Sequence, residues 1–257
     1  MYLISVGEIF LKGNNRNLFE KKLIRNLRKA LELKPEELQR YRNRYIITNE
    51  SKIDNIQRVF GVYSYAKTIK CKLNLEAINE LTLSLIKNEK TFRISSKRLH
   101  SINMSSTEVN EKVGEFILKN KTIKVDLKNP EVNIHIEEVG KAAYLYTKII
   151  KGPGGLPVGS SGFVFLRVND EIKSTVAAYL MMKRGCIIAI SKELPEIQKF
   201  EYGGEIRVRE EKDNDFIVVD ETFKDINLEE EKKFVMSPLI GYSDREIKEI
   251  YNKIKLI

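Results

Sequence analysis

The sequence predicts a chain that combines α/β and α+β units, and three observations lead to this fold class. The N-terminal elements follow a β-α-β-β-α order, which is typical of a small ferredoxin-like unit. Residues 151–162 hold five of the 14 glycines and two of the six prolines, a density that marks a domain boundary. Beyond them an apolar strand enters an apolar helix, and continuous apolar runs follow that are typical of parallel strands buried on both faces.

Residues 1–60 are expected to form the ferredoxin-like unit. Leucines at 18, 23, 27 and 31 recur at helical spacing after a polar loop at 12–16, which predicts a helix. Ser51 and Asp54 have the spacing of a capping box, which predicts a second, short helix. The expected elements are a strand at 2–6, a helix at 17–33, strands at 38–41 and 44–48, and a helix from 51.

Residues 61–158 alternate between strands and helices in a similar way. Ser105 and Glu108 have capping-box spacing and predict a helix start. Asn129-Pro130 predicts a turn, because proline lacks an N–H donor and restricts the residue before it. The expected elements are strands at 63–70, 91–95, 122–125, 132–137 and 142–150, and helices at 75–87 and 105–121.

Residues 159–257 are expected to form an open parallel-sheet α/β domain that is short of strands. Ser243 and Glu246 again have capping-box spacing and predict a closing helix. A glycine-rich loop that binds phosphate must abut a helix N-terminus, whereas 151–162 precedes a strand, so a linker is favoured there. The expected elements are strands at 163–168, 186–190, 205–209 and 216–219, and helices at 174–184 and 243–254.

Charge is distributed unevenly along the 257 residues, whose formal net charge is +9. Residues 1–150 carry an excess of 11 positive charges, whereas residues 151–257 carry an excess of two negative ones. This asymmetry is expected if RNA contacts lie N-terminal, although a solvated Lys/Glu-rich surface, common in thermophiles, would also produce it.

Composition also excludes several classes of protein. Two cysteines are too few for a disulfide framework or a zinc site. The longest apolar run, Val176–Met182, is too short to span a bilayer, and no signal peptide is visible at the N-terminus. We therefore expect a cytoplasmic protein without a metal site and without a membrane partner.

The turn between the strand at 163–168 and the helix after it is where α/β proteins bind phosphate. It contains no glycine and carries two carboxylates, Asp170 and Glu171. A carboxylate about 4 Å from a phosphate costs several kcal/mol at an effective dielectric near 20. We therefore interpret the two acids as the start of a structural helix, although Lys173 or a bridging Mg²⁺ would favour phosphate.

The segment KGPGGLPVGSSG, the strand after it and VAAYLMMKRG together resemble the ThiI-type tRNA 4-thiouridine synthetase (tRNA sulfurtransferase) family. That family holds ATP with a Ser-Gly-Gly-Ile-Asp-Ser pyrophosphatase (PP) loop, and only Ile172 and Ser174 of residues 169–174 match it. Asn169 replaces the first serine, Asp170 and Glu171 replace the two glycines, and Lys173 replaces the aspartate. The resemblance also covers residues 6–23, 92–114, 125–137 and 237–254.

The resemblance implies three domains. Residues 1–60 form the N-terminal ferredoxin-like domain, residues 61–158 a THUMP RNA-binding domain, and residues 159–257 a degenerate, shortened PP-loop ATP-pyrophosphatase-like domain. If any nucleotide binds, residues 169–174 are the expected site.

Candidate RNA contacts gather after the strand at 91–95. Basic side chains, hydroxyl groups and a helix N-terminus together favour binding of a phosphate backbone. Arg40, Arg42 and Arg44 alternate along a hairpin and are expected to share one face, which would suit either RNA or solvent. The predicted contacts are Lys97, Arg98, His100, Ser105, Ser106 and Thr107, with Lys12 and Arg16 as a second group.

Sulfur transfer requires an accessible thiol of low pKa. Cys186 opens an apolar strand and is expected to be buried, whereas Cys71 lies between two lysines that would lower its pKa. Neither matches the family's catalytic cysteine, so we predict structural roles for both and assign no catalytic residue.

We therefore expect a tRNA-binding protein that reads the acceptor-stem region and uses no cofactor. The alternative is an active tRNA sulfurtransferase that uses ATP and Mg²⁺ through its atypical loop, or that relies on a partner enzyme for the catalytic domain. A homodimer is compatible with either hypothesis. A third possibility is that the C-terminal domain senses a different nucleotide.

Overall fold

The computed structural model describes residues 1–97, 99, 101–225 and 235–257. The chain divides into two compact units, one made of residues 1–5, 39–50 and 64–150, the other of residues 6–38, 51–63 and 151–257. These units interleave along the sequence, so the predicted domain boundaries at 60 and 158 remain a prediction. No helix in the described ranges is long and apolar enough to cross a membrane.

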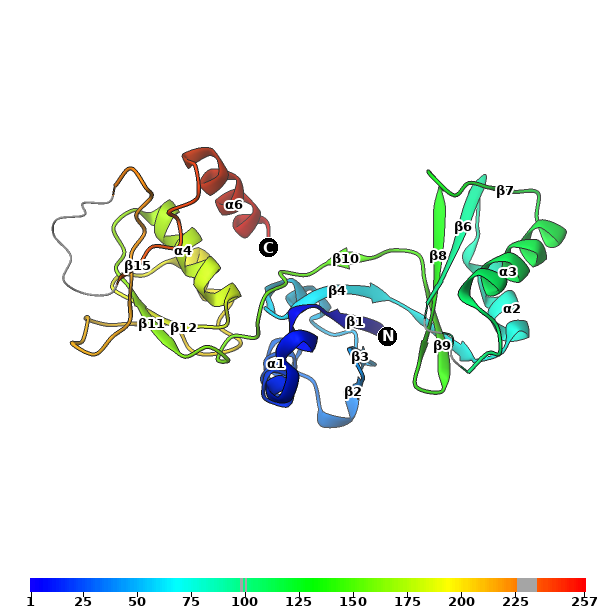
Figure 1. The fold of residues 1–257 in the computed structure, drawn as a ribbon, viewed down its shortest axis with the longest axis horizontal. Coiled ribbons are helices and arrows are strands. Elements are labelled where there is room, and N and C mark those ends of the chain that lie inside the picture. The colour runs from blue at the N-terminus through cyan, green and yellow to red at the C-terminus, as the bar shows by residue number, and fades with distance from the viewer. Residues whose placement is uncertain (98, 100, 226–234) are drawn as a thin grey trace. The chain divides into compact units, whose positions relative to one another are not determined.

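The first sheet has the strand order β10-β4-β1-β3-β2 (Figure 1). Strand β1 (Tyr2–Val6) pairs antiparallel with β3 (Arg44–Ile47), with Tyr2 opposite Ile47. The order along the chain confirms the ferredoxin-like prediction. Its elements also include η1 (Glu8–Asn15), α1 (Arg16–Leu31), η2 (Pro35–Glu37), β2 (Leu38–Tyr41), η3 (Ile53–Arg58), β4 (Val62–Lys67) and β10 (Ile150–Lys151).

Two local predictions for this region are wrong. The segment 12–16 is not an open loop, since most of it lies in the 3₁₀ helix η1. The predicted capping box at Ser51 does not form, because Lys52 adopts a left-handed conformation (φ 53°) and the 3₁₀ turn η3 starts after it. The second helix of the ferredoxin-like unit is thus a short 3₁₀ turn.

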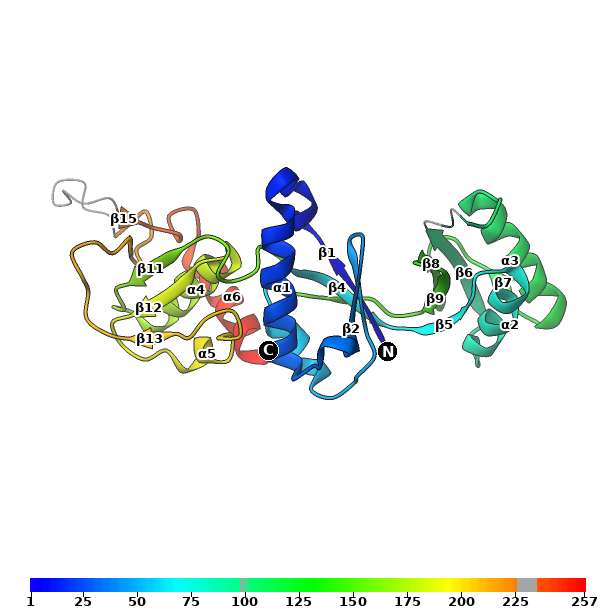
Figure 2. The ribbon, with the colours of Figure 1, turned by 90° about the horizontal axis from the view of Figure 1, so that it is seen from below.

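The second sheet lies entirely within the first compact unit and has the order β5-β9-β8-β6-β7. Strand β6 (Thr91–Lys97) runs parallel to β8 (Val132–Val139), which forms an antiparallel hairpin with β9 (Ala142–Tyr146). Helices α2 (Leu75–Leu85) and α3 (Ser106–Asn120) cover one face (Figures 1 and 2). The remaining strands are β5 (Ile69–Lys72) and β7 (Lys124–Val125).

Two predicted strands each split between these sheets. The run at 63–70 breaks at Thr68, whose N–H donates to Met1 O (3.0 Å) and whose hydroxyl donates to Leu145 O (3.0 Å). The run at 142–150 likewise divides into β9 and β10. Each of these two extended segments therefore contributes one strand to the first sheet and one strand to the second sheet.

A buried ion pair joins β3 to β8. Arg44 Nε lies 2.8 Å from Glu137 Oε1, and the two side chains are 13% and 1% exposed. Arg40 and Arg42 are exposed, so the three arginines of this hairpin do not share one face as predicted. Beside the pair, an apolar cluster that includes Leu3, Ile46, Ala66, Tyr144 and Tyr146 fills the core.

The third sheet lies in the second compact unit, and all its strand pairs are parallel. Its order is β13-β12-β11-β14-β15, so counting the strands along the chain gives 3-2-1-4-5. This is the doubly wound order, in which a ligand crevice is expected between strands 1 and 4. The elements are β11 (Phe163–Leu166), α4 (Glu171–Lys183), β12 (Ile187–Ile190), α5 (Pro195–Gln198), β13 (Arg207–Val208), β14 (Ile217–Val218), β15 (Val235–Met236) and α6 (Asp244–Leu256).

The glycine-rich segment 151–162 packs against the end of α4. The N–H groups of Gly159, Ser160 and Ser161 all point to the carbonyl of Gly185, at 2.8–3.1 Å. A Cβ on Gly185 would lie 2.4 Å from Ser160 Oγ, and its φ is +93°, so glycine is required there. These N–H groups hold a backbone carbonyl, which agrees with the prediction that the segment is no phosphate loop.

Candidate nucleic-acid interface and nucleotide crevice

The carboxyl end of β6 is fixed to the first turn of α3. Ser96 N–H donates to Asn110 Oδ1 (2.9 Å), and Ser96 Oγ donates to Ser106 O (2.9 Å). Lys97, the next residue, is exposed. Side chains alternate along a strand, so Lys97 lies on the face of β6 opposite to Ser96 and α3, and the predicted convergence of this lysine with the helix start remains a prediction.

Helix α3 begins with the predicted capping box. Ser105 Oγ accepts the Glu108 N–H (3.2 Å), and the Glu108 carboxylate accepts the Ser105 N–H (2.7 Å). In the part of the chain that the structure describes, no protein acceptor takes the N–H groups of Ser106 and Thr107. Two backbone donors and their hydroxyls therefore face solvent where a helix N-terminus attracts anions.

The Glu108 carboxylate is the opposing charge at this helix start. Its hydrogen bonds from the Ser105 N–H and hydroxyl hold its pKa below the usual value, so it is ionised at neutral pH. It offsets part of the attraction for phosphate, and the positive charge that acts on it is that of Lys112, which also lowers its pKa.

The helix-free face of the second sheet extends this basic region. Arg93 is exposed on β6 and lies on the same face of the strand as Lys97. The ring of His135 on β8 stacks on Tyr146, with centroids 5.0 Å apart and an angle of 12°. Burial, followed by the charges of Lys97 and Arg93, lowers the pKa of His135, so its ring is neutral at pH 7.

Sequence reasoning missed Arg93 and His135. The alternation of Arg93, Ser95 and Lys97 along one strand was the signal for the first. The second depends on the register of β8 against β6, which places His135 opposite Ser95. Periodicity within one strand does not predict that register.

Two predicted contacts, Arg98 and His100, lie outside the described residues. Their neighbours are anchored on both sides. Leu99 is buried, and Ser101 donates its N–H (2.9 Å) and its hydroxyl (2.5 Å) to Glu138. Both contacts remain predictions.

The second predicted group, Lys12 and Arg16, belongs to the other compact unit. Lys12 Nζ lies 5.3 Å from the centre of the Phe19 ring. Arg16 donates twice to Glu20 Oε1 (2.8 and 2.9 Å), and the Glu20 side chain is 1% exposed. Arg16 is thus committed to a local ion pair, and its contact with RNA also remains a prediction.

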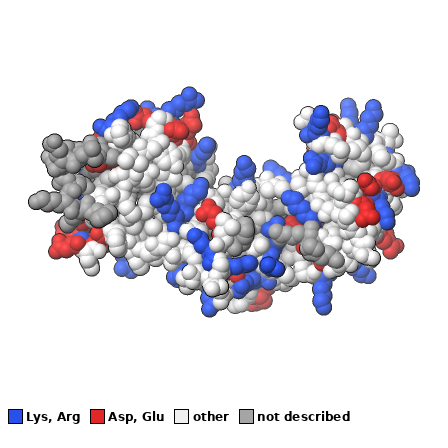
Figure 3. All heavy atoms as spheres, in the orientation of Figure 1, with Lys and Arg blue, Asp and Glu red and all other residues white. Residues whose placement is uncertain are grey.

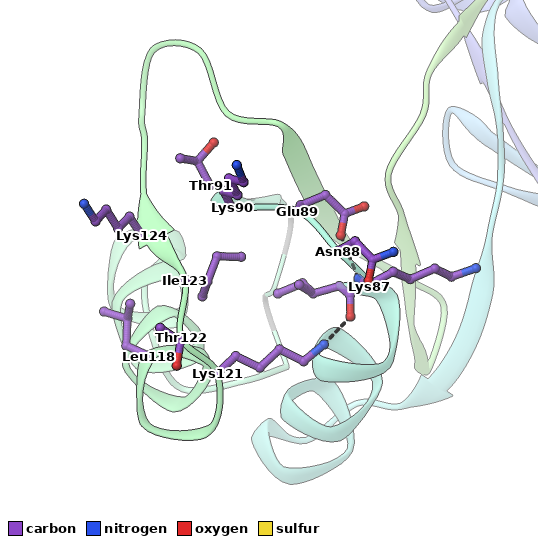
Figure 4. A pocket seen from close by; sticks show the side chains of 11 residues that line it. Lys87, Asn88, Glu89, Lys90, Thr91, Leu118, Lys121, Thr122, Ile123 and Lys124 are labelled. Atoms are coloured by element: carbon purple, nitrogen blue, oxygen red, sulfur yellow. Dashed lines mark hydrogen bonds between the residues drawn. The ribbon is translucent and has the colours of Figure 1, made fainter.

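A hollow of about 890 Å³ lies at the other end of the second sheet (Figure 4). Lys121 reaches across it to the carbonyl of Ile86, while Lys87 and Lys124 extend away in opposite directions (Figure 4). These lysines surround the hollow without converging in it. Figure 3 shows basic side chains scattered over the drawn face with acidic ones between them, so charge alone does not define a site.

The Asp220 carboxylate lies beyond the carboxyl ends of β11 and β14, where this strand order predicts a ligand crevice. It accepts the N–H groups of Asn169 (3.1 Å) and Asp170 (2.8 Å), the Asn169 side-chain amide (3.0 Å) and the Ser174 hydroxyl (2.5 Å). The Asp220 residue is 3% exposed. Burial raises the pKa of its carboxyl, but these hydrogen bonds together lower it further, so the net pKa is below the usual value.

The acids at the start of α4 have the structural role that the sequence predicted. Asp170 is the N-cap and accepts the Lys173 N–H (2.8 Å), so the helix begins at Glu171 instead of Ser174. Lys173 Nζ pairs with Asp225 (2.7 Å), and this hydrogen bond raises the pKa of the lysine. The cation considered for phosphate binding is therefore already paired.

Both cysteines are in environments that suppress reactivity. Burial raises the pKa of the Cys186 thiol and of the Cys71 thiol. The neighbouring lysines do not lower the Cys71 pKa, because Cys71 packs toward the helix-covered core while Lys70 and Lys72 alternate to the other face. Among the described residues, no group of three or more His, Cys, Asp or Glu side chains is placed to hold a metal.

Comparison with known proteins agrees with the two N-terminal folds. Residues 1–66 match the family model described as ThiI ferredoxin-like domain, and residues 73–148 match the THUMP domain. A probable tRNA sulfurtransferase of Mycoplasmopsis agalactiae is 40% identical over 186 residues. The N-terminal part of the chain thus carries the ThiI ferredoxin-like domain and the THUMP domain.

The similarity of this chain to its curated relatives is partial. The Mycoplasmopsis match covers 71% of this chain and 49% of the relative, and a probable tRNA sulfurtransferase of Thermoanaerobacter is 38% identical with 71% and 50% coverage. The chain spans about half the length of the curated relatives it matches. The family assignment therefore rests on the N-terminal part.

Solved structures extend the likeness of this chain to its full length. The crystal structure of PH1313 from Pyrococcus horikoshii is 29% identical, with a TM-score of 0.82 and 99% of each chain covered. A 4-thiouridine synthetase–RNA complex with bound ATP has a TM-score of 0.79 at 22% identity, covering 98% of this chain and 84% of that one. The second likeness shows the fold, including a parallel-sheet α/β domain after the THUMP domain.

Proposed function

We propose that this protein binds tRNA through its THUMP and ferredoxin-like domains and carries out no adenylation or sulfur transfer of its own. The observations that support RNA binding best are the open N–H groups of Ser106 and Thr107 at the start of α3 and the exposed Lys97 at the end of β6. A cation and helix-start donors are the groups that position a phosphate backbone. The match of residues 73–148 to the THUMP domain supports the same proposal.

Recognition by shape and phosphate position suits this surface better than base reading. Double-stranded RNA exposes its phosphates and 2′-hydroxyls, whereas its major groove is too narrow for side chains. The neutral His135 ring and the exposed Arg93 lie on the same sheet face and extend the surface beyond one phosphate. We infer that the acceptor-stem region is the part bound, on the family resemblance.

The absence of ATP chemistry is proposed from the crevice. A triphosphate there would have to displace the Asp220 carboxylate and would face Asp170 and Glu171. Because Lys173 is already paired with Asp225, its charge is not free to offset them. We therefore propose that the protein needs no cofactor. We also propose that it acts in the cytoplasm.

The alternative is an active tRNA sulfurtransferase that uses Mg·ATP, alone or with a partner enzyme that supplies the catalytic domain. The names of the curated relatives favour it. A homodimer would fit either function.

Two titrations of the purified protein separate these functions. We expect tRNA to bind more tightly than a DNA hairpin of equal charge, and we expect no heat from millimolar Mg·ATP and no tRNA-dependent release of pyrophosphate. Equal affinity for tRNA and DNA would contradict the RNA site. Micromolar ATP affinity that is lost in Lys173→Ala would support the enzyme instead.

A further inference from the structure

The donor set around Asp220 has the composition of an oxyanion site. Two consecutive backbone N–H groups, a side-chain amide and a hydroxyl converge on one carboxylate. Backbone N–H groups and hydroxyls in this arrangement bind phosphate and other small anions in many proteins. The location agrees, since strands β11 and β14 flank the point where the 3-2-1-4-5 order reverses.

The anion in this position comes from the chain itself. Asp220 follows β14, more than 40 residues after the turn that it contacts. The next residues are anchored as well. Asp225 accepts the N–H (2.9 Å) and the hydroxyl (2.7 Å) of Thr222 and pairs with Lys173 (2.7 Å). Residues 220–225, which we call the acidic strap, therefore hold both the donors and the lysine of the crevice.

We propose that Asp220 is a tethered anion that occupies the oxyanion position of the third sheet, so the crevice is closed to free anions while the acidic strap is seated. The proposal is independent of RNA binding, because its atoms belong to the α/β domain alone. It differs from an ordinary structural role in one respect. If Asp220 is removed, the donors are left buried without an acceptor, and a small anion should replace the carboxylate.

The test is chemical rescue of Asp220→Ala. We expect its thermal midpoint to fall below that of the wild type and to rise with added sodium formate, compared with sodium chloride at equal ionic strength. The rise should follow the logarithm of formate concentration, as required for a ligand that binds only the folded state. The wild type should show no difference between the two salts.

Two control variants identify the site. Asp225→Ala removes an acid of the same strap outside the donor set, so formate should not rescue it. Asp220→Ala combined with Ser174→Ala lacks a donor and should respond more weakly than Asp220→Ala. If Asp220→Ala does not fold in chloride, the yield of folded protein in formate against chloride is the measure.

Three outcomes would overturn the proposal: no formate-specific gain in midpoint or yield, an equal gain in Asp225→Ala, or formate binding by the wild type. Loss of tRNA binding by the wild type would instead contradict the proposed function alone. Titration of Asp220→Ala with inorganic phosphate shows whether the opened crevice also admits a tetrahedral anion. Binding there, with none in the wild type, supports the proposal.

Discussion

Arg44→Met removes the guanidinium that faces the buried carboxylate of Glu137. Breaking a buried ion pair from one side costs about 3–5 kcal/mol, because the remaining buried charge loses an oppositely charged partner. The Arg44 side chain is 13% exposed, so water reaches part of the ion pair. We therefore expect a loss of stability at the lower end of this range, about 3 kcal/mol. Urea unfolding followed by circular dichroism measures the loss as a shift of the transition midpoint.

Two further variants separate this effect from loss of a surface charge. Arg42→Met, on the same hairpin but exposed, should change stability by less than about 0.5 kcal/mol. Arg44→Met combined with Glu137→Leu should recover most of the loss, since it leaves no unpaired buried charge. A cost below about 1 kcal/mol for Arg44→Met, the range of an exposed pair, would refute the reasoning.

Three other predictions test separate parts of the structure. Gly140→Ala should cost about 1–3 kcal/mol, because φ is +65° and the new Cβ would lie 2.6 Å from Tyr41 Cε1; Gly13→Ala, with φ +51° and open space, should cost less in the same urea assay. The pKa of Asp220 is lowered in the folded protein, so its stabilising effect is present above its unfolded pKa and is lost as pH falls through the folded value. The difference in stability between the wild type and Asp220→Asn should therefore shrink in acid, and a constant difference would contradict this. Cys186, which is 6% exposed, should react with a thiol reagent only as fast as the domain opens, and labelling in native buffer at the rate of a free thiol would argue against burial.

The sequence predicted those elements whose signals are local. The capping boxes at Ser105 and Ser243 form as expected and start α3 and α6. At Ser51 the same spacing failed, because Lys52 turns left-handed before the helix can begin. A capping box needs its first residue in an extended conformation, and residue spacing does not report that.

Long-range partners explain the remaining differences. Asp220 lies more than 40 residues from the turn at Asn169 and Asp170 that it contacts. The sequence of that turn therefore predicted the loss of a phosphate site, but it did not predict that Asp220 would accept the hydrogen bonds of the turn. Arg44 could be placed on a hairpin but not beside Glu137, since that contact joins two sheets. The break at Thr68 likewise depends on Met1 and Leu145, which accept its hydrogen bonds.

The salt dependence of tRNA binding by Lys97→Ala, compared with Lys248→Ala, tests the proposed RNA site most directly. Both variants remove one exposed lysine charge, but Lys248 lies on α6, which belongs to the other compact unit. We expect Lys97→Ala to weaken binding about fivefold to tenfold at 0.1 M salt and to reduce the salt slope by about one, while Lys248→Ala stays near the wild type. Equal losses in both variants would mean diffuse attraction to a basic protein and would contradict a defined phosphate contact at Lys97.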